Sequence, residues 1–259
     1  MKISRRTALK LSLLTGLSLT RKHSLFAMVG FAKPSNLLAP GAALKAGRWA
    51  MAIDVKKCLA AKDCHDACIG ACREAHNIPD IPNKKHEVKW VWREQGDHLF
   101  PDQLDEYRGA ELARQTVPAL CNHCASPPCT RVCPTGATFK RSDGIVVMDP
   151  HRCIGCRFCM AACPYGSRSF NWEDPRPYLK QINPDYPTRT KGVVEKCTFC
   201  DKRLAQGRPP ACVAACPAGA MVFGDLKDEK SPVVRLLGEN YSICRKPELG
   251  TSPGVYYVV

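Results

Sequence analysis

The sequence predicts an α+β fold that is rich in loops and built of short helices and hairpins, and three observations support this. Sixteen of the 17 cysteines fall into four quartets of closely spaced residues. The 259 residues include 21 prolines and 18 glycines, which favour loops and turns over long helices. The turn sequence Ser142-Asp143-Gly144 separates two short apolar segments and indicates a hairpin between the second and third quartets.

The four quartets differ in spacing, and three of them end in Cys-Pro. They are Cys58, Cys64, Cys68 and Cys72; Cys121, Cys124, Cys129 and Cys133; Cys153, Cys156, Cys159 and Cys163; and Cys197, Cys200, Cys212 and Cys216. The third has the C-x2-C-x2-C-x3-C-P spacing of bacterial two-cluster ferredoxins, in which three cysteines hold one cluster and the fourth leads to the other. We therefore predict that these sixteen cysteines are the metal ligands of four 4Fe-4S clusters.

Local patterns predict several elements between the quartets. Strands are expected over Arg48–Val55, Lys89–Trp92 and Ala220–Phe223, a hairpin over Ala137–Lys140 and Ile145–Met148, and a short surface helix over Gln103–Gln115. Pro175–Pro187 holds four prolines and is expected to be an extended loop. No element is predicted after Tyr241.

Other classes of protein fit less well. A zinc scaffold would use two short pairs of ligands, and a disulfide scaffold is typical of chains too short to form a core. The formal net charge of +14 is inflated, because four clusters with their thiolates would remove roughly eight positive charges. No recognition helix or basic stripe is present, so no nucleic-acid partner is expected. No nucleophile with a base and no glycine-rich phosphate loop is apparent, so no catalytic residue is predicted.

The N-terminus predicts an export signal. Arg5 and Arg6 form a twin-arginine box, followed by a short apolar stretch over Leu9–Leu19. That stretch is too short to span a bilayer unaided. An uncleaved anchor that includes Leu25–Ala32 and a chance arginine pair are the alternatives. Residues 1–45 are expected to be signal and linker, and the folded protein to reach the extracytoplasmic, periplasmic face of the cytoplasmic membrane.

Residues 50 to 240 resemble the four-cluster ferredoxin-type electron-transfer subunits of complex iron–sulfur oxidoreductases, such as dimethyl sulfoxide reductase, polysulfide reductase and the formate-dependent nitrite reductase system. Leu120–Gly136, Asp149–Gly166 and Glu195–Asp225 carry the similarity. Within that family the export signal and the expanded first quartet, C-x5-C-x3-C-x3-C, bring the chain nearest to the DsrO-type subunits of the DsrMKJOP complex of sulfur metabolism and of its archaeal relative, the Hdr-like menaquinol-oxidising complex. The expanded quartet departs from the compact form of the general family.

The resemblance implies tandem bacterial 2×(4Fe-4S) ferredoxin-like units, one inserted in the other. The outer unit would comprise residues 48–118 and 188–240, the inner unit residues 119–187, and the tail residues 241–259. The resemblance also implies four ligand sets: Cys58, Cys64, Cys68 and Cys216; Cys197, Cys200, Cys212 and Cys72; Cys121, Cys124, Cys129 and Cys163; and Cys153, Cys156, Cys159 and Cys133.

The function implied is a relay of single electrons between a membrane quinone or haem partner and another redox subunit. The implied partners are an NrfD-like integral membrane subunit that interacts with quinone and a haem or iron–sulfur subunit, so membrane contact is made through partners. The alternative in the same class is the electron-wire subunit of a molybdopterin oxidoreductase. Alternatives from other classes are an enzyme acting alone on a sulfur compound and a disulfide or zinc scaffold.

A few residues near the quartets have open roles. His65 and His123 could ligate iron as histidine does in Rieske centres, although each quartet already has four sulfurs. The cations Arg131, Arg157, Arg168 and Lys196 either tune cluster potentials or lie on the solvated surface. The tryptophans Trp49, Trp90, Trp92 and Trp172 are expected to pack in the core or at interfaces, and Cys244 to be a buried, inert thiol.

Overall fold

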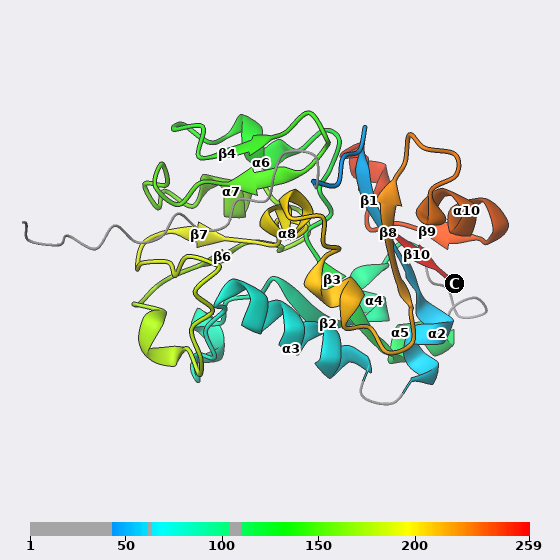
Figure 1. Cartoon of the computed structure of the whole chain (residues 1–259), viewed down its shortest axis with the longest axis horizontal. Coiled ribbons are helices and arrows are strands. Elements are labelled where there is room, and N and C mark those ends of the chain that lie inside the picture. The colour runs from blue at the N-terminus through cyan, green and yellow to red at the C-terminus, as the bar shows by residue number, and fades with distance from the viewer. Residues whose placement is uncertain (1–42, 62–63, 104–109) are drawn as a thin grey trace, which may run out of the picture. The chain divides into compact units, whose positions relative to one another are not determined.

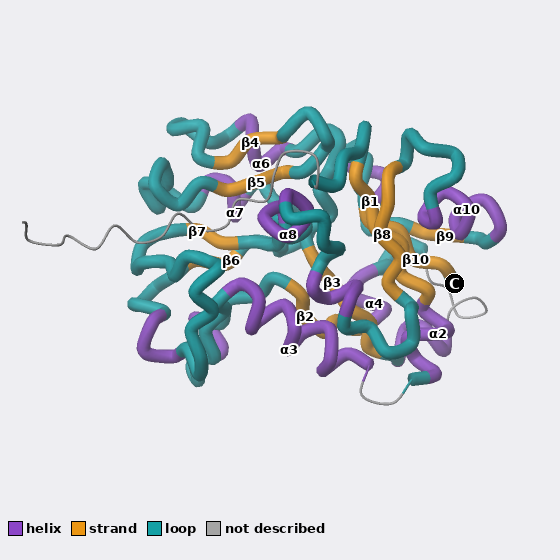
Figure 2. The backbone as a smooth tube through the Cα atoms, viewed as in Figure 1, coloured by secondary structure: helices purple, strands orange, loops and turns teal. Residues whose placement is uncertain are grey.

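A computed structural model describes residues 43–61, 64–103 and 110–259, all of which belong to one compact unit (Figure 1). The twin-arginine box therefore lies outside the described residues. Short elements joined by long loops make up this unit, as Figure 2 shows. The predicted α+β class with short helices and hairpins is confirmed.

A four-stranded sheet forms one side of the described unit, with the strand order β8-β1-β10-β9. Its central strand β1, Trp49–Asp54, is buried at all six positions. β8, Met221–Asp225, pairs antiparallel with β1, and β10, Val255–Val258, pairs parallel with it, so that Met51 lies between Phe223 and Val255. β9, Ser242–Ile243, adds an antiparallel edge. Burial on both faces explains why β1 is apolar at nearly every position.

Three two-stranded ladders complete the strands. β2, Val91–Gln95, pairs with β3, Thr116–Leu120; β4, Thr138–Lys140, pairs with β5, Val146–Met148; and β6, Ser169–Phe170, pairs with β7, Val194–Glu195. All three are antiparallel. In Figure 1 the last two ladders lie away from the four-stranded sheet, on the side where α6, α7 and α8 gather.

The helices are short, and most of them carry or flank cysteines. They are α2 Val55–Ala60, α3 Cys64–His76, α4 Gly96–Leu99, α5 Ala110–Arg114, α6 Pro128–Arg131, α7 Phe158–Ala161, α8 Asp201–Ala205, α9 Ala211–Ala214 and α10 Pro232–Glu239. Single 3-10 turns cover η2 Lys84–His86, η3 Arg176–Tyr178 and η4 Pro247–Leu249. With cysteines on so many separate elements, the fold can bring thiols from distant segments together.

The predicted elements are mostly present. The strand over Arg48–Val55, the hairpin around Gly144 and the strand over Ala220–Phe223 are confirmed as β1, β4–β5 and β8. The strand expected over Lys89–Trp92 begins two residues later, as β2. The helix expected over Gln103–Gln115 is observed as α5, with residues 104–109 outside the described part. The loop over Pro175–Pro187 contains one short turn, η3.

The segment after Tyr241 contains β9, η4 and β10, for which the sequence supported no prediction. β10 is the inner neighbour of β1, and its Tyr257 side chain is fully buried, with its hydroxyl donating to the carbonyl of Pro118 at 3.1 Å. The Tyr257 ring also packs edge-on against Phe100, with the ring centroids 4.9 Å apart. The C-terminal residues are therefore part of the main core.

Candidate iron–sulfur sites

Cys121, Cys124, Cys129 and Cys163 line one small cavity, which we call site 3. Strand β3 ends at Leu120 and places Cys121 at its edge, while α6 starts at a proline and holds Cys129 in the protein interior. Burial raises the pKa of the Cys124 thiol to about 12, with the neighbouring Cys121 adding to the rise. The structure thus brings together three cysteines of the second quartet and the last cysteine of the third.

Cys133, Cys153, Cys156 and Cys159 line a second small cavity, called site 4. Its loop turns sharply at Gly155, whose φ is +72° and where an added Cβ would lie 2.5 Å from the carbonyl oxygen of Gly192. Only glycine fits both conditions. Three of the four thiols are half-buried, so site 4 is more exposed than site 3.

Cys72, Cys197, Cys200 and Cys212 form site 2, and all four are buried. Cys72, Cys197 and Cys212 pack in the same core cluster. Burial raises the pKa of Cys72 well above its usual range, and the charges of Cys200, Cys197 and Cys212 raise it further. Two backbone amides donate to sulfur, Phe199 to Cys197 at 3.4 Å and Ala211 to Cys200 at 3.3 Å.

The remaining quartet positions, Cys58, Cys64, Cys68 and Cys216, are the ligand set that the resemblance implies for a further site, which we call site 1. Cys58 on α2 and Cys216 pack in one small buried cluster, and the amide of Ala220 donates to the Cys216 sulfur at 3.3 Å. Cys68 on α3 is buried and lies close enough to Cys72 and Cys212 to act on their pKa values. The side chains of Cys64 and His65 lie outside the described residues.

The residues around sites 2 to 4 fit iron–sulfur clusters as ligands. Four thiols gather at each of these sites, and these twelve cysteines are not joined by disulfides. Within the described ranges no three His, Cys, Asp or Glu side chains converge as the ligands of a single metal ion do. Cluster ligands are spread over the corners of a cubane. The side-chain amide of Asn122 is buried beside the site 3 thiols and has no hydrogen-bond partner among the described residues. It is therefore available to a bound group.

His123 is buried in the core, and its Nε2 has no hydrogen-bond partner among the described residues. Its ring stacks on Phe199 at 3.7 Å between centroids, and the amide of Val146 donates to its Nδ1 at 3.1 Å. Burial, helped by the charges of Lys196 and Arg168, lowers the pKa of His123 well below its usual range. The ring is therefore neutral, and its hydrogen bond to Val146 assigns the proton to Nε2.

The four cations beside the cysteines divide into two pairs. Arg131 and Arg157 are exposed, as the surface interpretation expects, and the Arg157 guanidinium lies 4.7 Å from the centre of the Trp172 ring. Arg168 and Lys196 are buried, so the surface interpretation is wrong for them. The Lys196 ammonium donates to the carbonyls of Cys197, at 2.7 Å, and Val146. Only tertiary packing separates the two pairs.

The other single-residue expectations have mixed outcomes. Core packing is confirmed for Trp49, Trp90 and Trp92, whereas Trp172 is 40 % exposed on a loop. Cys244 is half-buried, so the expectation of a buried thiol is wrong. It lies in the segment that joins β9 to η4, close to the surface.

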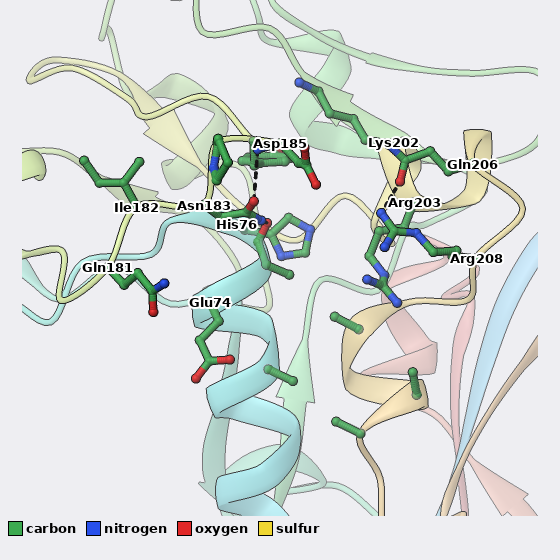
Figure 3. Close-up of a pocket in the computed structure, with 17 residues that line it drawn as sticks. Glu74, His76, Gln181, Ile182, Asn183, Asp185, Lys202, Arg203, Gln206 and Arg208 are labelled. Atoms are coloured by element: carbon green, nitrogen blue, oxygen red, sulfur yellow. Dashed lines mark hydrogen bonds between the residues drawn. The ribbon is translucent and has the colours of Figure 1, made fainter. Parts of the chain in front are cut away.

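A pocket of about 550 Å³ beside site 2 was not predicted from the sequence. It lies at the C-terminal end of α3, between the loop that carries Asn183 and the α8–α9 segment (Figure 3). Lys202, Arg203 and Arg208 line one side of it. His76 forms part of its wall, and burial lowers the pKa of this histidine to about 4. The imidazole also bonds the carbonyl of Cys72 at 3.0 Å, which joins the wall to site 2.

A buried ion pair is joined to the same wall, because Arg189 donates hydrogen bonds to the backbone carbonyls of His76 and Asn77. The guanidinium of Arg189 and the carboxylate of Glu195 are 2.7 Å apart and almost fully buried. The indole of Trp90 and the amide of Asn171 also donate to Glu195, at 3.1 and 2.5 Å. Both carboxylate oxygens of Glu195 therefore have hydrogen-bond donors, which lowers the cost of burying its charge. No helix in the described ranges combines the length and the apolar character needed to cross a bilayer.

Comparisons with known proteins agree with the thiol geometry. The 4Fe-4S dicluster domain matches residues 112–177 and 177–226. The chain is 42% identical over 245 residues to Hdr-like menaquinol oxidoreductase iron-sulfur subunit 1 of Archaeoglobus fulgidus, covering 87% of this chain and 88% of the relative. It is 37% identical to the menaquinone reductase iron-sulfur cluster-binding subunit of Nitratidesulfovibrio vulgaris, over 82% and 88%. It is also 37% identical to a tetrathionate reductase subunit of Salmonella typhimurium, over 82% and 72%.

These matches cover most of this sequence and most of each relative. The resemblance inferred from the quartets is thereby confirmed. The protein is a member of the family of 4Fe-4S electron-carrying subunits of respiratory oxidoreductase complexes.

Proposed function

We propose that the chain relays single electrons through four 4Fe-4S clusters, one at each of sites 1 to 4, between a membrane partner that handles quinone or haem and another redox subunit of a sulfur-metabolism respiratory complex. The clusters supply the one-electron chemistry, and the chain supplies spacing, burial and tuning of potential. The finer fold proposed is an inner ferredoxin-like unit, residues 119–187, inserted into an outer unit of residues 48–118 and 188–240.

The order of the thiols carries this proposal. The charge of Cys68 in site 1 raises the pKa values of Cys72 and Cys212 in site 2. In the same way, the charge of Cys121 in site 3 raises the pKa of Cys197 in site 2. The charge of Cys129 in site 3 raises the pKa of Cys159 in site 4. Each site therefore has a thiol that lies near a thiol of the next site, and the sites follow one another in the order 1, 2, 3, 4. A linear series with one exit at each end suits a relay better than it suits a catalyst.

The ligand sets proposed for sites 2, 3 and 4 share one arrangement of cysteines. In each, three cysteines of one quartet lie with the terminal cysteine of another, which is the exchange expected of paired ferredoxin clusters. Cys58 and Cys216 of site 1 meet in the same way. We propose all sixteen quartet cysteines as ligands on this basis.

The proposed partners follow from the two exits. One end would face an NrfD-like integral membrane subunit that interacts with quinone, and the other a haem or iron–sulfur subunit, on the extracytoplasmic side of the membrane. Similarity to a menaquinol oxidoreductase subunit and, at 37% identity, to the NrfC homologue of Haemophilus influenzae supports this placement. Similarity to subunits of tetrathionate reductase and polysulfide reductase favours a second candidate, the wire of a molybdopterin reductase.

Purification of the native complex tests the relay. Detergent extraction should recover the chain with a multi-span protein, and added quinol should reduce its clusters only while that protein is present. Co-purification with a molybdopterin subunit would favour the second candidate. Recovery of the whole pool as a salt-washed monomer that quinol reduces unaided would contradict both.

The surface of site 4 predicts where one partner binds. Ile154, which lines the site 4 cavity, is 67% exposed, and Phe158 on α7 is 59% exposed. Exposed apolar side chains over a half-buried redox site are typical of a docking face. Phe158→Asp is expected to weaken binding of the neighbouring subunit by about 10- to 100-fold, the loss typical of an interface anchor. Surface plasmon resonance with the isolated partner would measure it.

Tyr241→Asp is the matched control, because Tyr241 is 75% exposed on a different element, after α10. Binding should be unchanged in this variant. Equal binding by the Phe158→Asp and wild-type proteins would show that this face is not the docking surface.

A further inference from the structure

We propose that Arg168 is a positioning residue shared by sites 3 and 4, and that its guanidinium bridges ligand sulfurs of both sites and raises the reduction potentials of their two clusters together. The inference rests on the proposed cluster sites. It assigns to one side chain a role in two centres at once.

The contacts of Arg168 place it between the two sites. The side chain lines the site 3 cavity with Cys121 and Cys129, and the residue is only 6% exposed. Its Nη2 donates to the hydroxyl of Thr138 at 2.8 Å, and its Nη1 lies 4.0 Å from the sulfur of Met148. Thr138 and Met148 are directly paired across the β4–β5 hairpin, and Met148 lines the site 4 cavity. The guanidinium therefore reaches from the wall of site 3 to the wall of site 4.

The hairpin holds this arrangement from the other side. The Thr138 hydroxyl, while it accepts from Arg168, donates to the carbonyl of Val147 at 3.0 Å, so its lone pairs face the guanidinium. Thr138 is itself buried. The position of the arginine head is thus set by a group that cannot rotate away without losing a buried hydrogen bond.

The charge of Arg168 has no carboxylate to neutralise it among the described residues. Its charge instead acts on the thiols of Cys129 and Cys159, where it opposes the rise in pKa that burial causes, and the charges of Cys129, Cys159 and Cys121 raise the pKa of Arg168 in turn. A buried cation is costly unless an anion accompanies it. In the loaded protein the thiolates of Cys129 in site 3 and Cys159 in site 4 supply that anion, so the cation is matched to both clusters.

A buried cation of this kind favours the reduced state. Reduction adds an electron to a cluster, and a nearby positive charge that solvent does not screen stabilises the added charge. Arginine suits two simultaneous partners because its planar head presents five donors in a fixed fork, whereas lysine presents a single point charge. Removing Arg168 should therefore lower two potentials and leave the other two in place.

Arg157 provides the contrast. It is next to the proposed ligand Cys156 in the sequence, yet it is exposed and lies over the Trp172 ring. Solvent screens its charge, so it should contribute little to either potential. A comparison of Arg168 with Arg157 therefore distinguishes the effect of burial between two sites from the effect of lying near a cysteine in the sequence.

A redox titration, monitored by EPR spectroscopy, tests the proposal on the Arg168→Gln and Arg157→Gln proteins. Iron is counted first, and a wild-type content well below about sixteen atoms would contradict the cluster sites, not the role of Arg168. In the Arg168→Gln protein two of the four one-electron waves should move to lower potential, each by about tenfold in the ratio of oxidised to reduced cluster, or about 59 mV. The Arg157→Gln protein should match the wild type, and Arg168→Lys should restore part of the shift.

Movement of no wave, of one wave or of all four in the Arg168→Gln protein would overturn the proposal, as would an equal shift in the Arg157→Gln protein. If Arg168→Gln does not retain its iron, Thr138→Val decides the question. Valine keeps the volume of threonine and leaves the arginine charge in place, but it removes the acceptor that orients the fork. A smaller downward shift of the same two waves is expected, and unchanged potentials would overturn the bridging role.

Discussion

Replacing Cys197 by serine is expected to remove about four of about sixteen iron atoms per chain and to abolish electron transfer between the two ends of the protein. Cys197 is buried in site 2, and the charge of Cys121 in site 3 is one cause of its raised pKa, so the two thiols lie near one another. A serine hydroxyl is a poor iron ligand, so the cluster at site 2 should be lost. Because the sites are in series, losing an inner one breaks the relay while the outer clusters remain.

Iron analysis and stopped-flow reduction from one end measure the two effects. Cys244→Ser is the matched control, since Cys244 is half-buried and is outside all four quartets. That variant should keep its iron and its transfer rate. A Cys197→Ser protein that retains all of its iron would contradict the ligand assignment, and a wild-type content near twelve would mean that the expanded quartet at site 1 holds no cluster.

Replacing both Arg5 and Arg6 by lysine is expected to abolish export and to leave folded, cluster-loaded protein in the cytoplasm. The substitution preserves charge but removes the guanidinium pair, and lysine does not reproduce the planar hydrogen-bonding geometry of arginine. Cell fractionation with iron analysis of each fraction would measure it. Arg21→Lys, outside the box, is the control and should be exported normally.

The physical logic of this second prediction is that clusters must be assembled before export. A protein that carries them outside the cytoplasm has to cross the membrane folded, which twin-arginine signals permit. Arrival of the Lys-Lys variant at the outer face would mean that the arginine pair is not the signal. Cytoplasmic retention with full iron would show that loading and export are separate steps.

Several features could be predicted because they are encoded over short distances in the chain. The C-x2-C-x2-C-x3-C spacing restricts the loop geometry itself, so the candidate ligands could be named without a fold. β1 and the β4–β5 hairpin were predictable for the same reason, since a short apolar run and a Ser-Asp-Gly turn act within about ten residues.

Other features depended on segments far apart in the sequence. β10 pairs in parallel with β1, about two hundred residues away, and no local pattern sets that register. The pocket beside His76 forms from α3, the Asn183 loop and the α8–α9 segment, which meet only in the folded protein.

By itself, the sequence determined the chemistry of this protein, because ligand type and spacing are covalent properties of one loop at a time. Tertiary structure alone decided which cations are buried beside those thiols. Arg157 and Arg168 both follow closely on a cysteine, yet one is exposed and the other is buried between Cys129 and Cys159. The electrostatic effect of a charge on its neighbours grows when water is excluded from around it. Around Arg168 the β4–β5 hairpin and the neighbouring loops exclude water by packing against the side chain.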